Sequence, residues 1–128
     1  MSITKFEYIE TWQLSRELSS FVFKITQEGE FEKDYRFRSQ IRSSAGSIMD
    51  NIAEGFGRGG NKELINFLII ARGSCMETRS QSYRAFDFKY IDEQNFNKLL
   101  VMTDQIAIKL LNFINYLKKS DRKGPRYD

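Results

Sequence analysis

A helical repeat of apolar side chains meets a run of glycines in FRSQIRSSAGSIMDNIAEGFGRGGNKEL, residues 37–64. The glycines lie at positions 55, 57, 59 and 60, where they are expected to end the helix that precedes them. Asn61 follows them and is predicted to be the N-cap of the next helix. The apolar positions before the glycines are three or four residues apart, which is typical of one helix face: Phe37, Ile41, Ala45, Ile48 and Ile52.

Similar repeats on both sides of this stretch predict four helices, at about residues 8–28, 34–57, 61–89 and 92–119. Gly29 is expected to end the first helix, and Asp92 to cap the fourth. Ile91 and Phe96 have the spacing of a hydrophobic staple around that cap. Short connectors favour an all-α fold, an antiparallel up-down-up-down four-helix bundle. Residues 1–119 form this single domain, and residues 120–128 are predicted to be a polar, basic, disordered tail.

The third and fourth predicted helices carry more apolar residues than one bundle face needs. Two interpretations stay open, namely a broad core face or an interface between subunits. The surplus positions are Ile65, Ile69, Ile70, Val101, Ile108 and Leu111.

The second and third helices should pair as a hairpin about the glycine-rich turn. In that register Gly46 faces Gly73, which predicts a close approach of the two backbones. The same register places Arg42 opposite Glu77, either as an ion pair or as two solvated charges.

Composition argues against an enzyme. The chain has no histidine and one cysteine, so the commonest general base and the usual zinc ligands are missing. Cys75 lies on an apolar stripe and is interpreted as a small buried residue. Asp50, Glu54 and Arg58 are each four residues apart, and we interpret them as residues of helix-surface ion pairs, such as Glu54 with Arg58, rather than as a carboxylate site. We therefore expect no catalytic residue, no metal site and no cofactor.

Charge is unevenly distributed along the chain, and its net value is +3. Residues 35–90 carry nine basic and five acidic side chains, and residues 118–128 carry five and two. Such segments are candidates for phosphate-driven binding of RNA or DNA, with Tyr35 and Phe37 placed to stack on bases. The alternatives are solvated faces, or a scaffold that binds a protein partner. The candidate nucleic-acid-binding residues are Arg36, Arg38, Arg42, Arg58, Lys62, Lys118, Lys119, Arg122 and Lys123.

No apolar run reaches the length of a membrane span, and the first residues do not resemble a signal peptide. A cytoplasmic protein without a membrane partner is expected.

Two blocks of sequence resemble a known family. The first is QIR at 40–42, SI at 47–48 and NIAEGFGR at 51–58, and the second is KE at 62–63 with FLIIARGS at 67–74. Together they are similar to the signatures of the bacterial four-helix bundle protein family. Its members include proteins encoded in intervening sequences of 23S ribosomal RNA genes. The accessory variability determinant of diversity-generating retroelements is a relative.

The resemblance implies a four-helix bundle, a homopentamer and no established enzyme activity. The retroelement relative binds nucleic acid and a reverse transcriptase. The family pattern has Arg, Ala, Pro and Phe where this chain has Ser43, Ser44, Met49 and Leu64. The positions expected to be structural are Asn51, Glu54, Gly55, Gly57 and Arg58 of the signature, together with Gly46, Gly73 and Glu77.

Overall fold

The protein is an antiparallel four-helix bundle, shown here by a computed structural model that describes residues 3–122. A short 3₁₀ helix, η1, precedes the bundle, and a short helix, α2, lies between its first two long helices. The elements are η1 (Phe6–Tyr8), α1 (Glu10–Ile25), α2 (Gly29–Lys33), α3 (Tyr35–Gly57), α4 (Asn61–Asp87) and α5 (Glu93–Arg122).

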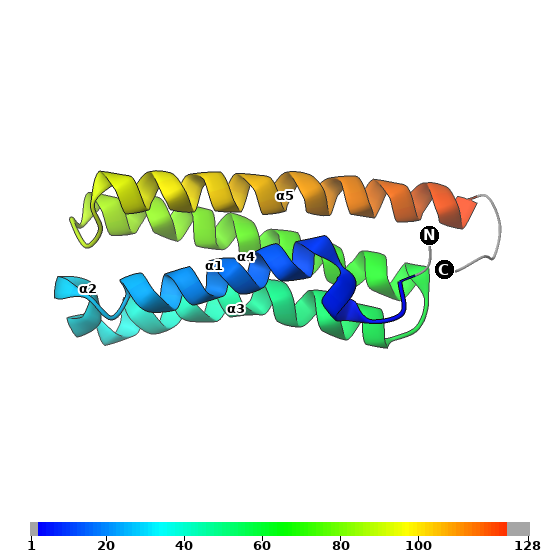
Figure 1. Ribbon diagram of the computed structural model, residues 1–128, viewed down its shortest axis with the longest axis horizontal. Coiled ribbons are helices and arrows are strands. Elements are labelled where there is room, and N and C mark those ends of the chain that lie inside the picture. The colour runs from blue at the N-terminus through cyan, green and yellow to red at the C-terminus, as the bar shows by residue number, and fades with distance from the viewer. Residues whose placement is uncertain (1–2, 123–128) are drawn as a thin grey trace.

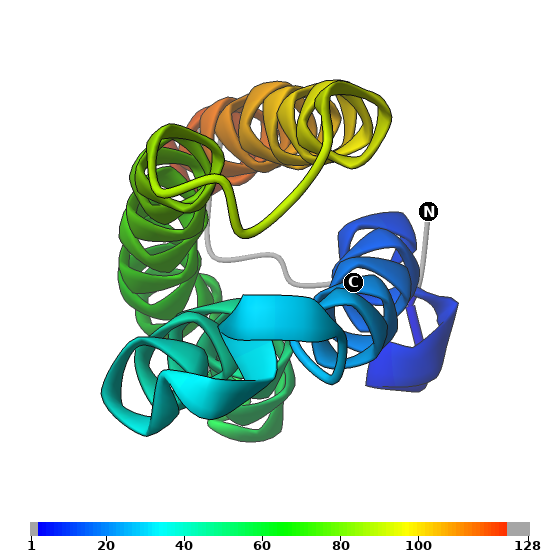
Figure 2. The same ribbon diagram turned by 90° about the vertical axis from the view of Figure 1, so that its left-hand side faces the viewer.

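The long helices follow one another around the bundle in chain order (Figure 1). Seen from the end, they form an arc that runs from α1 through α3 and α4 to α5 (Figure 2). The most extensive contacts join α3 to α4 and α4 to α5, whereas α1 and α5 touch least. The predicted all-α, up-down-up-down topology is confirmed.

One apolar core runs through the bundle, and each long helix contributes fully buried side chains to it. Leu18 comes from α1, Ile41 and Ile48 from α3, Leu68 from α4, and Leu110 from α5. Ile41 and Ile48 belong to the apolar stripe predicted for residues 34–57, and burial of one such stripe per helix holds a bundle of this kind together.

The first helix is shorter than predicted. It ends at Ile25 rather than near residue 28, and the hydroxyl of Thr26 donates a hydrogen bond to the carbonyl oxygen of Val22 (2.8 Å). Gly29, at φ +59°, begins α2 instead of ending α1. The connector is helical because it carries Phe31, whose side chain is fully buried in the core.

Of the two predicted N-caps, Asp92 is confirmed and Asn61 is wrong, and α3 has a side-chain cap that was not predicted. Asp34 Oδ1 accepts from the backbone N–H of Phe37 (3.1 Å) at the start of α3. Asp92 Oδ1 accepts from the N–H of Asn95 (2.8 Å), as predicted for α5. Asn61 is not the N-cap of α4; Gly60 occupies that position, and Asn61 is the buried first residue of the helix.

The last helix continues to Arg122. Residues 120–122, which the sequence assigned to the tail, are therefore helical, and the rest of the predicted tail lies outside the described residues.

The pairing of α3 with α4 differs from the predicted register. The hydroxyls of Ser47 and Ser74 meet at 3.0 Å, and Thr78 donates to the hydroxyl of Ser44 (2.9 Å). A Cβ atom added at Gly46 or at Gly73 would meet nothing within 4 Å. The predicted close approach at these glycines is therefore wrong.

The close approach lies nearer the turn, at Gly55. A Cβ atom built there would be 2.5 Å from the Cβ of Phe67 and 3.2 Å from a methyl group of Leu64. Gly55 therefore allows α3 and α4 to approach closely beside the turn, where a side chain would hold them apart.

Candidate nucleic-acid interface

The predicted basic residues divide between the two ends of the bundle. Arg36, Arg38 and Arg42 lie near the start of α3, beside α2. Arg58 and Lys62 flank the α3–α4 turn, which lies at the same end as the last turns of α5 with Lys118 and Lys119 (Figure 1). The structure does not describe the side chain of Arg122, and Lys123 lies outside the described residues.

Arg38 and Arg42 are engaged within the fold. Arg38 Nη1 donates to the carbonyl oxygen of Glu32 (2.9 Å), and its guanidinium lies 4.6 Å from the ring centre of Tyr35. Arg42 Nε donates to Thr26 Oγ1 (2.8 Å), and its guanidinium lies over the ring of Phe23 (4.3 Å). These contacts tie α1 and α2 to α3.

The predicted ion pair between Arg42 and Glu77 does not form. The side chain of Arg42 reaches α1 instead, because Thr26 and Phe23 offer it a hydrogen bond and an aromatic face there. Partial burial is the main cause of a lowered pKa of the Arg42 guanidinium, and the positive charge of Arg38 is the second.

The surroundings of this basic group are partly acidic. The helix α2 carries Glu30 and Glu32, and Glu30 pairs with Lys33 (3.2 Å). Phe37 is not available to stack on a base, since it is only 3 % exposed and packs against Phe31 (5.1 Å between ring centres). Tyr35 is 71 % exposed. At this end of the molecule Tyr35 is therefore an exposed aromatic side chain, with the guanidinium of Arg38 over its ring and mixed charges around it.

Two arginines of α4, Arg72 and Arg79, donate hydrogen bonds to α5. Arg72 Nε donates to the carbonyl oxygen of Ala107 (3.1 Å). Arg79 Nη1 donates to the carbonyl oxygen of Leu100 (2.7 Å) and to Thr103 Oγ1 (3.1 Å). Both belong to the basic segment 35–90, and nothing in the sequence marks which backbone carbonyl group a guanidinium will reach.

The signature NIAEGFGR builds the α3–α4 hairpin. Asn51 Nδ2 donates to the carbonyl oxygen and the hydroxyl of Ser47 (2.8 and 2.9 Å), and so orients the hydroxyl that meets Ser74. Arg58 Nη2 donates to Glu54 Oε2 (2.8 Å), which is the main cause of a raised Arg58 pKa. The arginine also lies over the ring of Phe67 (5.0 Å).

Three lysines at the turn end are exposed: Lys62, Lys118 and Lys119. Among the side chains of residues 3–120, which the structure describes, none is hydrogen-bonded or ion-paired to the side chain of Lys62, Lys118 or Lys119. In the α4–α5 register Arg72 reaches Ala107 and Cys75 reaches Thr103. Because the two helices are antiparallel, Lys62 at the start of α4 and Lys118 near the end of α5 lie at matching heights.

An apolar face extends over α4 and α5. Five of the six surplus residues are exposed, and Ile65 alone is buried, so the broad-core interpretation holds for that residue only. A groove of about 300 Å³ crosses this face, with Ile69, Met76 and Leu111 in its walls and the cations Arg72 and Lys118 beside them. The exposed surplus residues are Ile69, Ile70, Val101, Ile108 and Leu111.

Comparison with known proteins agrees with this arrangement. The family model described as "23S rRNA-intervening sequence protein" matches residues 7–112, from η1 into α5. The chain belongs to this family. No curated protein matches it significantly.

A solved structure gives the same fold for a second protein of this kind. It is a protein of unknown function from the S23 ribosomal protein family of Bacteroides thetaiotaomicron VPI-5482. The TM-score is 0.74 at 22 % identity, over 81 % of this chain and 97 % of that one. The likeness therefore shows that this chain shares the fold of that protein.

The described part of this family member holds no group of three acidic or cysteine side chains placed to bind a metal ion. Cys75 is buried, and its Sγ donates to the carbonyl oxygen of Thr103 (3.2 Å). Burial raises the pKa of this thiol to about 12, so a reactive thiolate does not form near neutral pH. None of the helices within residues 3–122 is both long and apolar enough to cross a membrane.

Proposed function

We propose that this 23S rRNA-intervening sequence protein is a non-enzymatic oligomer that binds RNA or DNA weakly, as an accessory factor in a nucleic-acid process. Phosphate contacts at the turn end of the bundle would supply the affinity. The observation that supports the proposal is the group of exposed lysines there, Lys62, Lys118 and Lys119, which no acidic side chain of residues 3–120 engages. Most of the candidate arginines already serve the fold.

Binding of this kind follows charge and ignores base sequence. Each phosphate contact adds about 0.7–0.9 to the slope of log affinity against log salt. The homopentamer implied by the family resemblance would repeat the three lysines in every subunit. Several phosphates of one strand could then be met at once, and weak single contacts would add up.

The test compares two charge reversals of equal size. One variant changes Lys62, Lys118 and Lys119 to Glu, and its control changes Lys24, Lys33 and Arg36 to Glu at the other end. Fluorescence anisotropy with labelled RNA and DNA, at about 50 and 200 mM salt, measures the affinity. We expect the first variant to lose about tenfold or more in affinity, and the control to lose much less.

Equal losses in both variants would mean that net charge alone drives the binding, which contradicts a site at the turn end. If the unaltered protein binds no nucleic acid at low salt, the nucleic-acid role is wrong. A protein-interaction scaffold then becomes the better proposal. The apolar face of α4 and α5 favours that second function, because its exposed residues could bind a protein partner as well as another subunit.

A further inference from the structure

An exposed aromatic side chain, Tyr116, lies on α5 shortly before Lys118 and Lys119. Residues three apart on a helix are neighbours on its surface, so Tyr116 and Lys119 lie side by side. Toward α4, Tyr116 lines a small pocket together with Asn61, the residue that precedes Lys62. An aromatic ring and lysines from two helices therefore gather at the turn end of the bundle.

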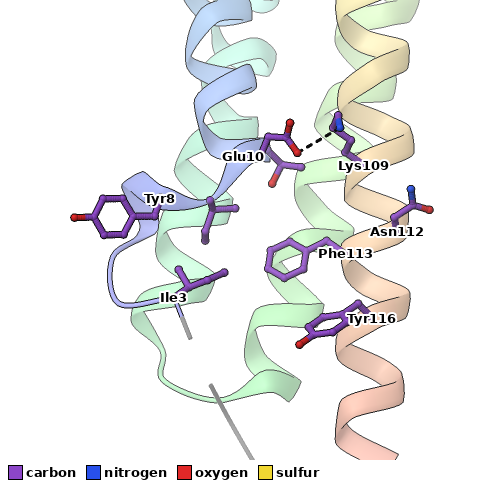
Figure 3. Close-up of a pocket in the computed structure, with 9 residues that line it drawn as sticks. Ile3, Tyr8, Glu10, Lys109, Asn112, Phe113 and Tyr116 are labelled. Atoms are coloured by element: carbon purple, nitrogen blue, oxygen red, sulfur yellow. Dashed lines mark hydrogen bonds and ion pairs between the residues drawn. The ribbon is translucent and has the colours of Figure 1, made fainter. Parts of the chain in front are cut away.

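The ring of Tyr116 is free to contact another molecule. The side chain is 52 % exposed and borders a cavity of about 540 Å³ between α1 and α5. Figure 3 shows it beside Phe113, on the side of α5 that faces α1. Among residues 3–120, no aromatic ring stacks on it and no guanidinium or ammonium group lies over it. In this it differs from Tyr35, whose ring lies under the guanidinium of Arg38 (4.6 Å).

A free aromatic ring beside lysines suits single-stranded nucleic acid. An unpaired base has open faces, so it can stack on a tyrosine ring while neighbouring phosphates contact the lysines. The bases of a duplex are already stacked on one another, so a duplex offers such a ring only its ends. We propose that Tyr116 stacks on one unpaired base and so gives the turn end a preference for single-stranded RNA or DNA. This inference rests on the proposed function, because the lysines there supply the attraction for phosphates.

The experiment separates the contribution of the base from that of the phosphates. Fluorescence anisotropy of the full chain, at about 50 mM salt, measures the affinity for labelled DNA probes. The probes are a thymidine oligonucleotide, an abasic strand and a duplex, all of the same length. The abasic strand keeps the phosphates and lacks the bases. We expect the thymidine strand to bind most tightly, by about fivefold or more over the abasic strand, as for one stacked base.

Three variants test the residue. Tyr116→Leu removes the ring but keeps an apolar side chain, and should lower the affinity for the thymidine strand to that of the abasic strand. Tyr116→Phe restores a ring and should recover the affinity. Tyr83→Leu is the matched control, because Tyr83 is 48 % exposed near the other end of α4, and it should leave all three affinities unchanged. Circular dichroism establishes that each variant is folded.

The outcomes distinguish this inference from the proposed function. If the unaltered protein binds the thymidine and abasic strands equally well, stacking is wrong while the proposed function stands, and this comparison needs no variant to fold. Stacking on Tyr116 is also wrong if Tyr116→Leu binds the thymidine strand as tightly as the unaltered protein, or loses no more affinity than Tyr83→Leu. Binding of none of the three probes would contradict the proposed function, and the inference with it.

Discussion

Gly55 is a residue at which α3 and α4 approach closely. A methyl group there would be 2.5 Å from the Cβ of Phe67, an atom too near the backbone to move aside alone. We expect Gly55→Ala to lower the free energy of unfolding by about 1–3 kcal/mol, since the helices must separate to admit it. Urea denaturation followed by circular dichroism measures the change.

Gly46 is the matched control for that substitution. It lies inside the same helix, but an added Cβ would touch nothing within 4 Å. Gly46→Ala should therefore raise the free energy of unfolding by about 0.5–1 kcal/mol, because alanine is the better helix former. A loss of stability at Gly46 similar to that at Gly55 would contradict the register described above.

At the scale of residues, the sequence predicted burial well and side-chain partners poorly. Cys75 is buried, as its place on an apolar stripe indicated. The partner of Arg42 was not predictable, because a long flexible side chain reaches several neighbours, and Thr26 and Glu77 were both within plausible reach.

At the scale of elements, four helices were predictable from apolar spacing and the fifth was not. The helix α2 has only five residues, too few for a periodic pattern, and acidic side chains surround its one buried residue, Phe31. Asp34 follows it and binds two elements. Its Oδ1 caps α3, and its Oδ2 accepts from the hydroxyl of Tyr90 (2.8 Å) in the α4–α5 connection.

These bonds predict a pH dependence. The N–H of Phe37 is the main cause, and the Tyr90 hydroxyl the second, of an Asp34 pKa below its usual 3.8. The carboxylate therefore adds stability above that pH, and the contribution is lost as the pH falls through the lowered pKa. Asp34→Asn keeps the oxygen cap without the charge, so its urea midpoint should fall less than that of the unaltered protein between about pH 5 and pH 2. Equal acid sensitivity of both proteins would show that Asp34 does not contribute.

At the scale of the whole molecule, the exposed face of α4 and α5 predicts self-association. Light scattering should give about five times the 15.1 kDa chain mass, if the family resemblance holds for subunit number. Combined Val101→Glu and Ile108→Glu places charge on that face and should yield single chains. Tyr8→Glu with Tyr35→Glu adds the same charge at exposed aromatics elsewhere and should leave the oligomer intact. A single 15.1 kDa species from the unaltered protein at micromolar concentration would contradict the prediction.

The open side of the arc, between α1 and α5, predicts that the bundle unfolds in part before it unfolds as a whole. Toward α5, α1 is held by the Glu10–Lys109 pair across a cavity, whereas α3 and α4 share buried hydrogen bonds such as Thr78 to Ser44. Opening of α1 alone should therefore require less free energy than global unfolding. In native-state hydrogen exchange, amides near Leu18 should exchange through this partial opening. Amides near Ile48 and Leu68 should exchange only when the whole chain unfolds.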